Sequence, residues 1–338
     1  MAKKIKAGII GFGNVGQALE KQLSKDQAWN VKFVSNSKHV YNNTKQCIQF
    51  IDEVSNYLKY FKDLDIVFLC IPSNTPKIAH NYIWQLIHQN VKVVICEKGA
   101  ISSGYNILMW GGVGYNATVG GGTMMLDELK NRINLNNFSN IYLVINGTIN
   151  FILDEMTKRE QSLDTIIKKV QAAGYCEPGQ NNILDIINQE IIEDVGKKIS
   201  ILLRVIFKSH LDLNSDSNHF HKILKSDLKK IRKEARDKRY VVIFQNPKNP
   251  GKYNLSKNDI ITINSINDIN KKTQISAGFM HLNHDSCLGK LIIPGVNNAF
   301  WIEGEKDIFP SPCGGPGAGP EATAQTMIKD AKRLLNIK

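Results

Sequence analysis

A glycine-rich segment, GIIGFGNVG at residues 8–16, constrains the fold of this chain more than any other feature. Gly11, Gly13 and Gly16 have the spacing G-x-G-x-x-G, at a point where an apolar run ends and a helix is predicted from Val15. In that context the first glycine allows a tight turn, the second lets the backbone approach a pyrophosphate, and the third allows the strand and helix to pack closely. We therefore expect a dinucleotide-binding turn, with a glycine turn that binds no ligand as the alternative.

Apolar strand-like and helix-like segments alternate through the first third of the chain. Strands are predicted at 5–12, 30–35, 65–72 and 91–98, and a helix is predicted at 76–90. Continuous apolar strands that alternate with helices indicate an α/β fold with a doubly wound, parallel sheet of the Rossmann type.

The rest of the chain has a different pattern. Helices are predicted near 124–134, 148–158, 162–173 and 190–207. Strands are predicted near 240–245, 260–264, 275–282, 289–294 and 298–303, before a last helix at 321–335. This succession indicates a second domain of the α+β class.

Charge and cysteine usage bear on the partners of the protein. The net charge is +12, and the most basic stretch, residues 225–239, is predicted as a helix in which basic and acidic residues are mixed. Because no aromatic residues are interleaved, a solvated helix face is favoured over nucleic-acid binding. None of the six cysteines forms a C-x-x-C pair, and Cys70 and Cys96 lie in apolar strands, where we expect core thiols. No apolar run reaches the roughly 18 residues of a membrane span, so we expect a cytoplasmic protein without a membrane partner.

The end of the second predicted strand bears on the choice of cofactor. A carboxylate here would bind the ribose 2′-hydroxyl of NAD, but the chain reads Ser35, Asn36, Ser37 and Lys38. A hydroxyl and a lysine can bind a 2′-phosphate, so NADP is favoured over NAD; the alternative is that Lys38 is an ordinary loop lysine. The candidate cofactor contacts are Gly11, Phe12, Gly13, Asn14, Val15, Gly16, Ser35, Ser37, Lys38, Ser73 and Thr75.

The strand predicted at 91–98 ends on two charged residues, Glu97 and Lys98. Open α/β proteins bind ligands at the carboxyl ends of their parallel strands. Lys98 is therefore a candidate functional residue, and the alternative is that the strand simply ends where charge begins.

A second charged pair lies on the apolar side of the helix predicted at 193–207. At about 100° per residue, Asp194 and Lys198 fall among the apolar side chains. The polar residues expected on the opposite side are Glu190, Glu193, Lys197, Ser200 and Arg204. An i,i+4 pair is usually an exposed helix stabiliser, but charges on a buried face are costly unless they are paired or used. We favour a functional role for Asp194 and Lys198.

Several motifs, in the same order along the chain, resemble those of the homoserine dehydrogenase family. The nucleotide loop GFGNVG and the strand end EKGAIS are similar to family segments, and INGTINFILDEM is close to its most recognisable motif. The segments YNATVGGGTMML, AAGYCEP, EDVGKKISIL, PGVNNAFWI and GGPGAGPEATA also resemble the family.

The resemblance implies reduction of aspartate 4-semialdehyde to homoserine with NADPH or NADH, a step toward threonine and methionine. It implies Lys98, Asp194 and Lys198 as catalytic residues, because a lysine can stabilise the alkoxide and deliver its proton. Two nearby lysines would lower each other's pKa toward neutrality. The substrate-binding residues that the resemblance implies are Gly147, Thr148, Tyr175 and Glu177.

The resemblance also implies a domain organisation and an oligomeric state. Residues 1–118 and 310–338 would form the nucleotide-binding domain, and residues 119–309 a substrate-binding and dimerisation domain. The protein would be a homodimer that binds a small-molecule substrate. Gly317, in the segment GPGAG, would offer a backbone amide beside the nicotinamide.

The chain departs from the family pattern at three places. Asn116 stands where a glutamate is expected near a monovalent cation, so only the backbone carbonyls of Val119, Gly121 and Thr123 would coordinate Na⁺ or K⁺. Glu97 replaces the usual asparagine before the strand-end lysine. The segment 178–193 is longer than usual.

Two other readings account for part of the sequence. A sugar oxidoreductase of the glucose–fructose oxidoreductase type also has a lysine after the strand, but Gly99 stands where that type has proline. A homologue with impaired catalysis could act as a nucleotide-binding protein, although the retained Lys98, Asp194 and Lys198 argue against it. Aspartate semialdehyde dehydrogenase would need a nucleophilic cysteine at the start of a helix, and no cysteine has that setting.

Overall fold

The computed structural model divides the chain into two compact units. It describes residues 4–43, 45–50, 58–104, 106–135, 137–158, 161–176, 179–208, 220, 222–249, 251, 260–267, 273–304 and 315–337. The first unit combines Met1–Met124 with Gly319–Lys338, and the second is Met125–Ala318. These boundaries fall after those expected at 118/119 and 309/310, so residues 119–124 belong to the first unit and 310–318 to the second.

The first unit contains a seven-stranded sheet in the order β4-β3-β2-β1-β5-β6-β7. Its strands are β1 (Ile5–Ile10), β2 (Trp29–Ser35), β3 (His39–Asn42), β4 (Cys47–Phe50), β5 (Ile66–Leu69), β6 (Lys92–Ile95) and β7 (Val113–Gly114). Five neighbouring strands, β2, β1, β5, β6 and β7, pair in parallel, which confirms the predicted doubly wound α/β class. The antiparallel strands β3 and β4 at one edge were not predicted.

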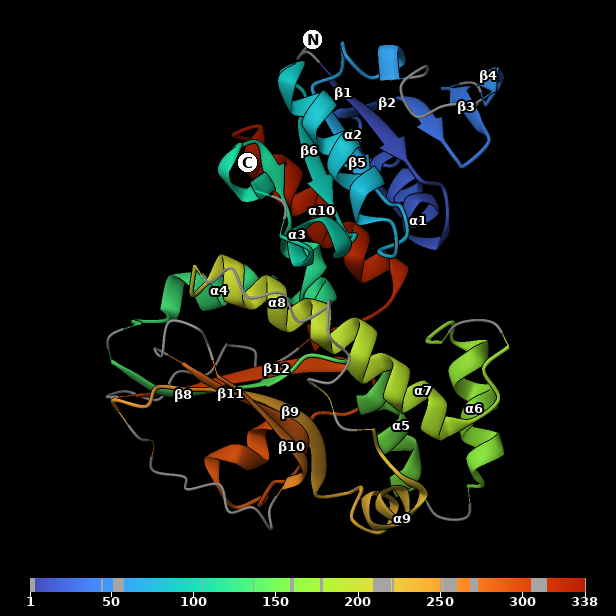
Figure 1. Cartoon of the computed structure of the whole chain (residues 1–338). Helices are drawn as coiled ribbons and strands as arrows, with labels where there is room; N and C mark the ends of the chain where they lie inside the picture. The colour runs from blue at the N-terminus through green and yellow to red at the C-terminus, as the bar shows by residue number, and fades with distance from the viewer. Residues whose placement is uncertain are drawn as a thin grey trace. The chain divides into compact units, whose positions relative to one another are not determined.

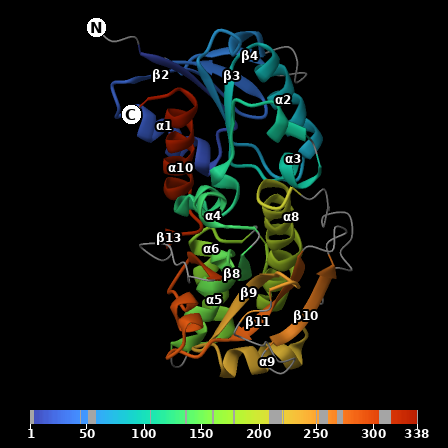
Figure 2. The same ribbon diagram turned by 90° about the vertical axis from the view of Figure 1, so that its left-hand side faces the viewer.

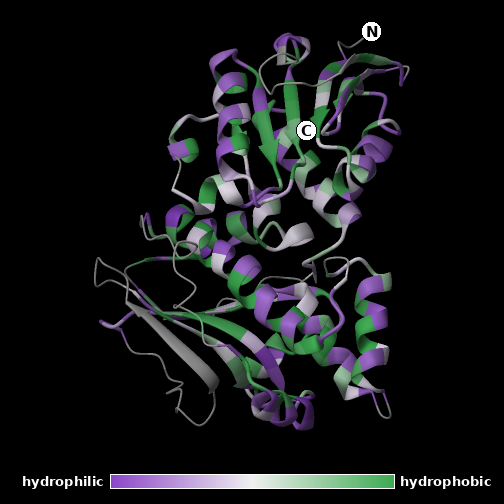
Figure 3. Cartoon of the chain, turned by 45° about the vertical axis from the view of Figure 1, so that its right-hand side comes forward, coloured by the Kyte–Doolittle hydropathy of each residue, from purple (hydrophilic) through white to green (hydrophobic). Residues whose placement is uncertain are grey.

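Helices cover both faces of this sheet. They are α1 (Asn14–Leu23), α2 (Pro76–His88), the short α3 (Gly99–Ser102) and α10 (Pro320–Leu334). Figure 2 shows α1 and α10 on one side of the sheet and α2 and α3 on the other, and Figure 3 shows the predominantly hydrophobic central strands between them. The core under α1 and α10 includes Leu19, Phe68 and Met327, all fully buried.

Helix α10 returns from the far end of the sequence to complete the first unit. Its Asp330 is fully buried and accepts hydrogen bonds from the backbone N of Asn116 (2.8 Å) and from Asn116 Nδ2 (2.6 Å). These contacts fix the C-terminal helix against residues that come directly after β7.

The second unit is built on an antiparallel sheet in the order β10-β11-β9-β8-β12-β13. Its strands are β8 (Phe138–Val144), β9 (Lys238–Gln245), β10 (Ile260–Asn267), β11 (Gln274–His281), β12 (Asn297–Gly304) and β13 (Gly315–Pro316). Strand β8 was not predicted. The strand predicted at 289–294 is wrong, because Cys287–Leu291 forms a 3-10 helix.

The helices of the second unit are α4 (Met125–Arg132), α5 (Gly147–Thr157), α6 (Leu163–Ala172), α7 (Ile183–Gln189), α8 (Gly196–Val205) and α9 (Lys225–Lys233). Figure 1 shows α4 and α8 along one face of the sheet. The helix predicted at 225–239 is wrong beyond Lys233, since β9 starts at Lys238. No helix in the described ranges is long and apolar enough to cross a membrane.

Candidate functional site

Two glycines of the loop between β1 and α1 are required by the backbone around them. Gly11 has a φ of +95°, and a Cβ there would lie 2.4 Å from the carbonyl oxygen of Cys70. A Cβ on Gly16 would lie 2.1 Å from the carbonyl oxygen of Gly11. The sharp turn and the close approach of α1 to β1, both expected from the glycine spacing, are therefore present.

The N-terminus of α1 is open to a ligand. Its N-cap residue, Gly13, makes no side-chain capping hydrogen bond, and the first turn of the helix has no acidic residue. A Cβ on Gly13 would meet no atom within 4 Å, and Gly13 and Asn14 are both exposed. Uncapped N–H groups at the positive end of the helix dipole bind anions, so this loop fits a pyrophosphate.

The residues after β2 differ in their exposure. Ser35 is fully buried, and its backbone oxygen accepts a hydrogen bond from Gly11 N at 2.8 Å. Asn36 Oδ1 accepts from the backbone N of Lys38 and of His39, both at 2.8 Å. This tight turn leaves Ser37 and Lys38 exposed, so these two side chains can reach a ligand while the Ser35 side chain is directed into the fold.

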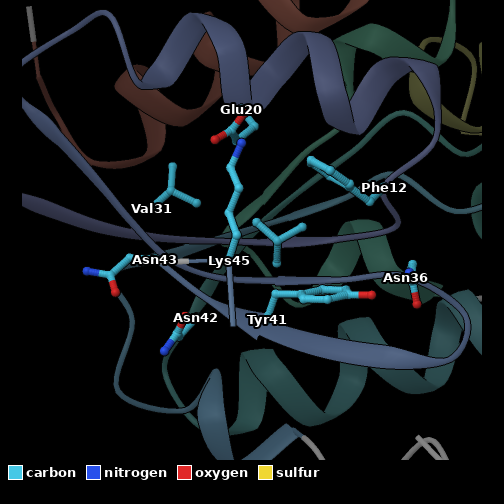
Figure 4. Close-up of a pocket in the computed structure, with 9 residues that line it drawn as sticks. Phe12, Glu20, Val31, Asn36, Tyr41, Asn42, Asn43 and Lys45 are labelled. Carbon is cyan, nitrogen blue, oxygen red and sulfur yellow. The ribbon is translucent and has the colours of Figure 1, made fainter. Parts of the chain in front are cut away.

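A pocket lies between α1 and the strands β2 and β3. Its lining residues are Phe12, Glu20, Val31, Val34, Asn36, Tyr41, Asn42, Asn43 and Lys45. Figure 4 shows Phe12 and Asn36 at one end of the pocket, and Lys45 extending across it toward Glu20. The pocket therefore begins at the glycine loop and has an apolar floor with a polar rim.

Serine and glutamate side chains hold the strand end that carries Lys98. The backbone N of Lys98 donates to Ser73 Oγ at 2.9 Å. Glu97 is 1% exposed, and its two carboxylate oxygens accept from the backbone N of Ala100, each at 3.2 Å. Thr75 directly precedes α2, and its Oγ1 donates to the carbonyl of Pro72 at 3.4 Å. Ser73 thus positions the backbone at Lys98, and Glu97 fixes the first turn of α3.

A buried polar cluster surrounds Lys198 in the second unit. The Lys198 side chain is 6% exposed, and its Nζ lies 2.7 Å from Asp194 Oδ2. Nζ also donates to the carbonyl oxygen of Ile145 at 2.6 Å. Asn146 Nδ2 donates to Asp194 Oδ2 at 2.8 Å and to Glu190 Oε2 at 2.6 Å. We call Asn146, Glu190, Asp194 and Lys198 the lysine cluster.

A π-helical turn shapes this cluster. Residues Glu190–Val195 form the π-helix η5 between α7 and α8, and a π-helical turn widens the helix locally. Glu190 and Asp194 are one such turn apart, which lets both carboxylates reach the amide of Asn146. Of the polar residues expected opposite Lys198, Glu193 is exposed, whereas Ser200 is fully buried and Arg204 is only 9% exposed.

The residues of the family-like signature anchor the start of α5. Asn146 Oδ1 caps the helix by accepting from Ile149 N at 2.7 Å, and a Cβ on Gly147 would lie 2.8 Å from Val296 O. Thr148 Oγ1 donates to the backbone oxygen of Tyr175 at 3.0 Å. Asn150 Nδ2 donates to the carbonyl oxygens of Ile293, Gly295 and Asn297. Glu177 lies outside the described residues.

The segment at β13 rests directly on β12. A Cβ on Gly317 would lie 2.2 Å from the Asn298 side chain, and Gly317 N donates to Val296 O at 2.9 Å. Asn298 is fully buried, and its Nδ2 donates at 3.4 Å to the same Ile145 oxygen that accepts from Lys198. Only glycine fits at position 317, because any side chain there would clash with Asn298.

The candidate cation segment follows β7 in the first unit. Asn116 is fully buried and bound to Asp330, as described above. Thr123 Oγ1 donates to the carbonyl oxygen of Gly120 at 2.8 Å, so this hydroxyl is already engaged. No group of three or more His, Cys, Asp or Glu side chains that could hold a metal ion occurs in the described part of the chain.

Sequence reasoning overlooked three residues of these sites. Asn146 lies within the recognised motif, and Glu190 stands four residues before Asp194, so spacing could have identified both. Asn298 lies in the family-like segment PGVNNAFWI, but its contact with Gly317 depends on the pairing of β12 with β13, which the sequence did not reveal.

The doubly wound sheet and the open glycine loop define the class of the protein: a Rossmann-type, NAD(P)-dependent oxidoreductase. Residues 125–331 match the family model of homoserine dehydrogenase, and residues 6–95 match that of NADP oxidoreductase, coenzyme F420-dependent. The chain belongs to the homoserine dehydrogenase family, which confirms the resemblance seen in its motifs.

Individual relatives agree with this assignment. The homoserine dehydrogenase of Lactococcus lactis subsp. lactis (strain IL1403) is 24% identical over an alignment of 356 positions, gaps included. The alignment covers 98% of this chain and 74% of that protein. That of Pseudomonas aeruginosa is 24% identical over 61% of this chain and 49% of its own length. A hyperthermophilic archaeal homoserine dehydrogenase in complex with NADPH has the same fold, with a TM-score of 0.68 at 19% identity over 99% of both chains.

Proposed function

We propose that this protein transfers a hydride between NADPH and aspartate 4-semialdehyde to give L-homoserine. The observation that carries the proposal is the lysine cluster, in which a buried ammonium group is held between Asp194 and a backbone carbonyl. The Asp194 carboxylate oxygen, 2.7 Å from Nζ, and the Ile145 carbonyl oxygen fix the direction of this group. Such an ammonium group can stabilise the negative charge that develops on the aldehyde oxygen of the substrate during hydride transfer.

Lys198 has a proton donor to spare for the substrate. A lysine ammonium has three N–H donors, and Asp194 and Ile145 engage two of them in the described part of the chain. The third N–H can bind the aldehyde oxygen, stabilise the negative charge that develops there, and transfer its proton to give the hydroxyl group. Asp194 acts by holding Nζ in place.

The roles proposed for the other substrate-binding residues follow from their chemistry. Glu177, which the resemblance implies as a substrate-binding residue, and Asp194 would offer carboxylate oxygens for the substrate ammonium group, and Glu190 adds a third carboxylate beside Asp194. Gly147 offers the first backbone amide of α5, and Thr148 and Tyr175 are bound to each other at the edge of the same helix. The substrate carboxylate is expected at the Gly147 amide, whereas the Thr148 hydroxyl, proposed from the sequence for the same role, donates to the Tyr175 backbone oxygen.

The first unit is proposed to bind the cofactor, which supplies the hydride when it is bound. The α1 N-terminus would hold its pyrophosphate, and Ser37 and Lys38 its 2′-phosphate. Lys98, at the carboxyl end of β6, would hold or donate a proton near the reacting group. Ser73 fixes its backbone by the hydrogen bond at 2.9 Å. The sequence placed the backbone amide of Gly317 beside the nicotinamide, but this N–H already donates to Val296 O at 2.9 Å and is therefore engaged within the second unit.

The remaining assignments come from the family. We propose a homodimer in the cytoplasm, with the first unit as nucleotide-binding domain and the second as substrate-binding and dimerisation domain. A Na⁺ or K⁺ ion would be coordinated by the carbonyls of Val119, Gly121 and Thr123, more weakly than with a glutamate at position 116.

Steady-state turnover tests the proposal. Purified protein is mixed with NADPH and aspartate 4-semialdehyde, or with NADP and homoserine, and the absorbance of the reduced cofactor is followed. We expect substrate-dependent change in both directions. Binding of NADPH without turnover of either substrate would contradict the proposal and favour a catalytically impaired homologue.

A binding measurement tests the preference for NADP. Lys38→Ala should weaken NADPH binding about tenfold, which corresponds to about 1.4 kcal/mol, and should leave NADH binding unchanged because NADH lacks the 2′-phosphate. Lys25→Ala, another exposed lysine of the same unit, is the control. Tighter binding of NADH than of NADPH to the unaltered protein would overturn the assignment.

A further inference from the structure

Three sulfur atoms meet in the core of the first unit. Cys70 directly follows β5 and Cys96 directly follows β6, and these neighbouring strands pair in parallel with Leu69 opposite Ile95. Cys70 and Cys96 are the next residues after this pair, so they lie beside each other at the ends of two neighbouring strands. Both pack against the core under α1 and α10. The Cys70 and Cys96 thiols interact with each other. Cys70 Sγ lies 4.0 Å from Met327 Sδ in α10, and Cys96 Sγ donates to the carbonyl oxygen of Leu69 at 3.8 Å.

We propose that Cys70, Cys96 and Met327 form a binding site for a soft monovalent metal ion, Cu⁺. Thiolate and thioether sulfurs are the ligands that Cu⁺ prefers. A planar three-coordinate site with metal–sulfur bonds of about 2.3 Å, as in metal thiolates, needs sulfur–sulfur separations of about 4.0 Å. The separation of Cys70 and Met327 already has this value.

The surroundings of the three sulfurs favour a soft ion over a hard one. The core that they join is apolar, with Phe68, Val94 and Leu19 among its members, and the three sulfur ligands themselves favour a soft ion, because a hard cation prefers oxygen ligands. Both cysteines are only partly buried, whereas Met327 is fully buried. A small ion can therefore reach the thiols from the solvent and meet the thioether inside.

Binding exchanges protons for the metal ion. A thiol binds a metal ion as the thiolate, so each cysteine must release its proton when the ion binds. Two thiols and one Cu⁺ give a bis-thiolate complex and release two protons, and no electron is transferred. The affinity should therefore fall as the pH is lowered.

The site has a physical connection to the proposed cofactor loop. The backbone N of Cys70 donates to Ile10 O at 2.7 Å, and the Cys70 carbonyl is the group that excludes a side chain at Gly11. Cys96 is followed by Glu97 and Lys98. Drawing the two thiolates onto an ion would shift both strand ends, so occupancy should weaken NADPH binding; this consequence rests on the proposed function, whereas metal binding does not.

A chelator competition tests the site. The reduced, full-length protein is titrated with Cu⁺, or with Ag⁺ as a probe that does not change oxidation state, against a chelator that reports free metal. We expect one ion per chain to bind at the sites of highest affinity, here called the tightest class, and two protons to be released. Cys70→Ser and Cys96→Ser should each weaken this class at least a hundredfold, and Met327→Leu about tenfold.

The controls separate this site from ordinary surface thiols. Cys47→Ser and Cys287→Ser remove cysteines outside the cluster and should leave the tightest class intact. A tightest class that survives in Cys70→Ser, or that is lost in Cys287→Ser, would overturn the proposal. Because metal binding is measured without substrate or cofactor, failure of the homoserine dehydrogenase assay would not affect this result.

Discussion

At the scale of single residues, the decisive feature is a lysine that is buried yet paired. A buried ion pair is not in itself evidence of stability, because desolvation offsets its attraction. Lys198 is bound to Asp194 and Ile145, and Asp194 in turn accepts from Asn146. Such an arrangement fixes the position of one N–H donor, which is the property that proton transfer to an alkoxide requires.

Replacement of this lysine should affect chemistry more than cofactor binding. Lys198→Ala is expected to lower kcat by about a hundredfold or more, the range for loss of a general acid, and to leave the Kd of NADPH within about twofold. Steady-state kinetics and a fluorescence titration of NADPH measure the two effects. Lys197→Ala changes a more exposed neighbour on the same helix and should behave as the unaltered protein; an equal fall in both variants would assign Lys198 to structure.

At the scale of secondary structure, the π-helical turn η5 and the cap of α5 meet at one asparagine. The amide oxygen of Asn146 caps α5, while its amide nitrogen donates to Glu190 and Asp194. The sequence predicted a helix at 190–207 and placed Lys198 on its buried side. It could not reveal that Ser200 and Arg204 are buried as well, because that depends on how other elements pack around α8.

Asn146→Asp separates the two roles of this side chain. Aspartate caps a helix as well as asparagine, but here it would face two carboxylates. We expect a loss of about 1–3 kcal/mol of stability at neutral pH, the cost of unsatisfied buried polar groups, measured from urea midpoints, together with a lower kcat. Asn182→Asp changes the N-cap of α7, where the side chain is exposed to solvent, and should be close to neutral. Equal stability of the two variants would contradict the geometry of the cluster.

Helices α5 and α6 are joined by a buried carboxylate whose charge sets a pH dependence. Glu155 is 4% exposed and pairs with Lys158 and Lys169. Burial favours the neutral acid, but the hydrogen bonds from the two lysines outweigh it and lower the pKa of Glu155 below 4.5. Since the folded-state pKa is depressed, the pair stabilises the protein above about pH 4.5, and this contribution is lost as the pH falls through the folded-state pKa.

Glu155→Gln should therefore destabilise the protein at pH 7 and not at low pH. We expect a difference of about 1–3 kcal/mol at pH 7, typical of hydrogen bonds to charged groups, which disappears below the pKa of Glu155. Urea unfolding at a series of pH values measures it. Glu128→Gln, in an exposed pair with Arg132, should change stability by less than about 1 kcal/mol at any pH. A pH-independent difference for Glu155→Gln would exclude the carboxylate charge as its cause.

At the scale of the whole molecule, each unit shows what a sequence pattern can and cannot predict. The parallel core of the first sheet followed from apolar strands and the glycine loop, but the hairpin of β3 and β4 is short and polar and gave no signal. Strand β8 was missed because Ser139 and Asn140 interrupt its apolar run. Both are buried in the sheet, where Asn140 Nδ2 donates to Glu303 at 2.7 Å, a partner 163 residues away in sequence.

The central claim is that this chain transfers a hydride to the aldehyde carbon of aspartate 4-semialdehyde, and isotope transfer tests it most directly. The protein is incubated with aspartate 4-semialdehyde and NADPH that carries deuterium at the transferable position on C4 of the nicotinamide ring. The product is analysed by mass spectrometry. We expect L-homoserine with one deuterium on its own C4, and little or no deuterated homoserine with Lys198→Ala. Consumption of the cofactor without homoserine, or homoserine without deuterium, would contradict the account.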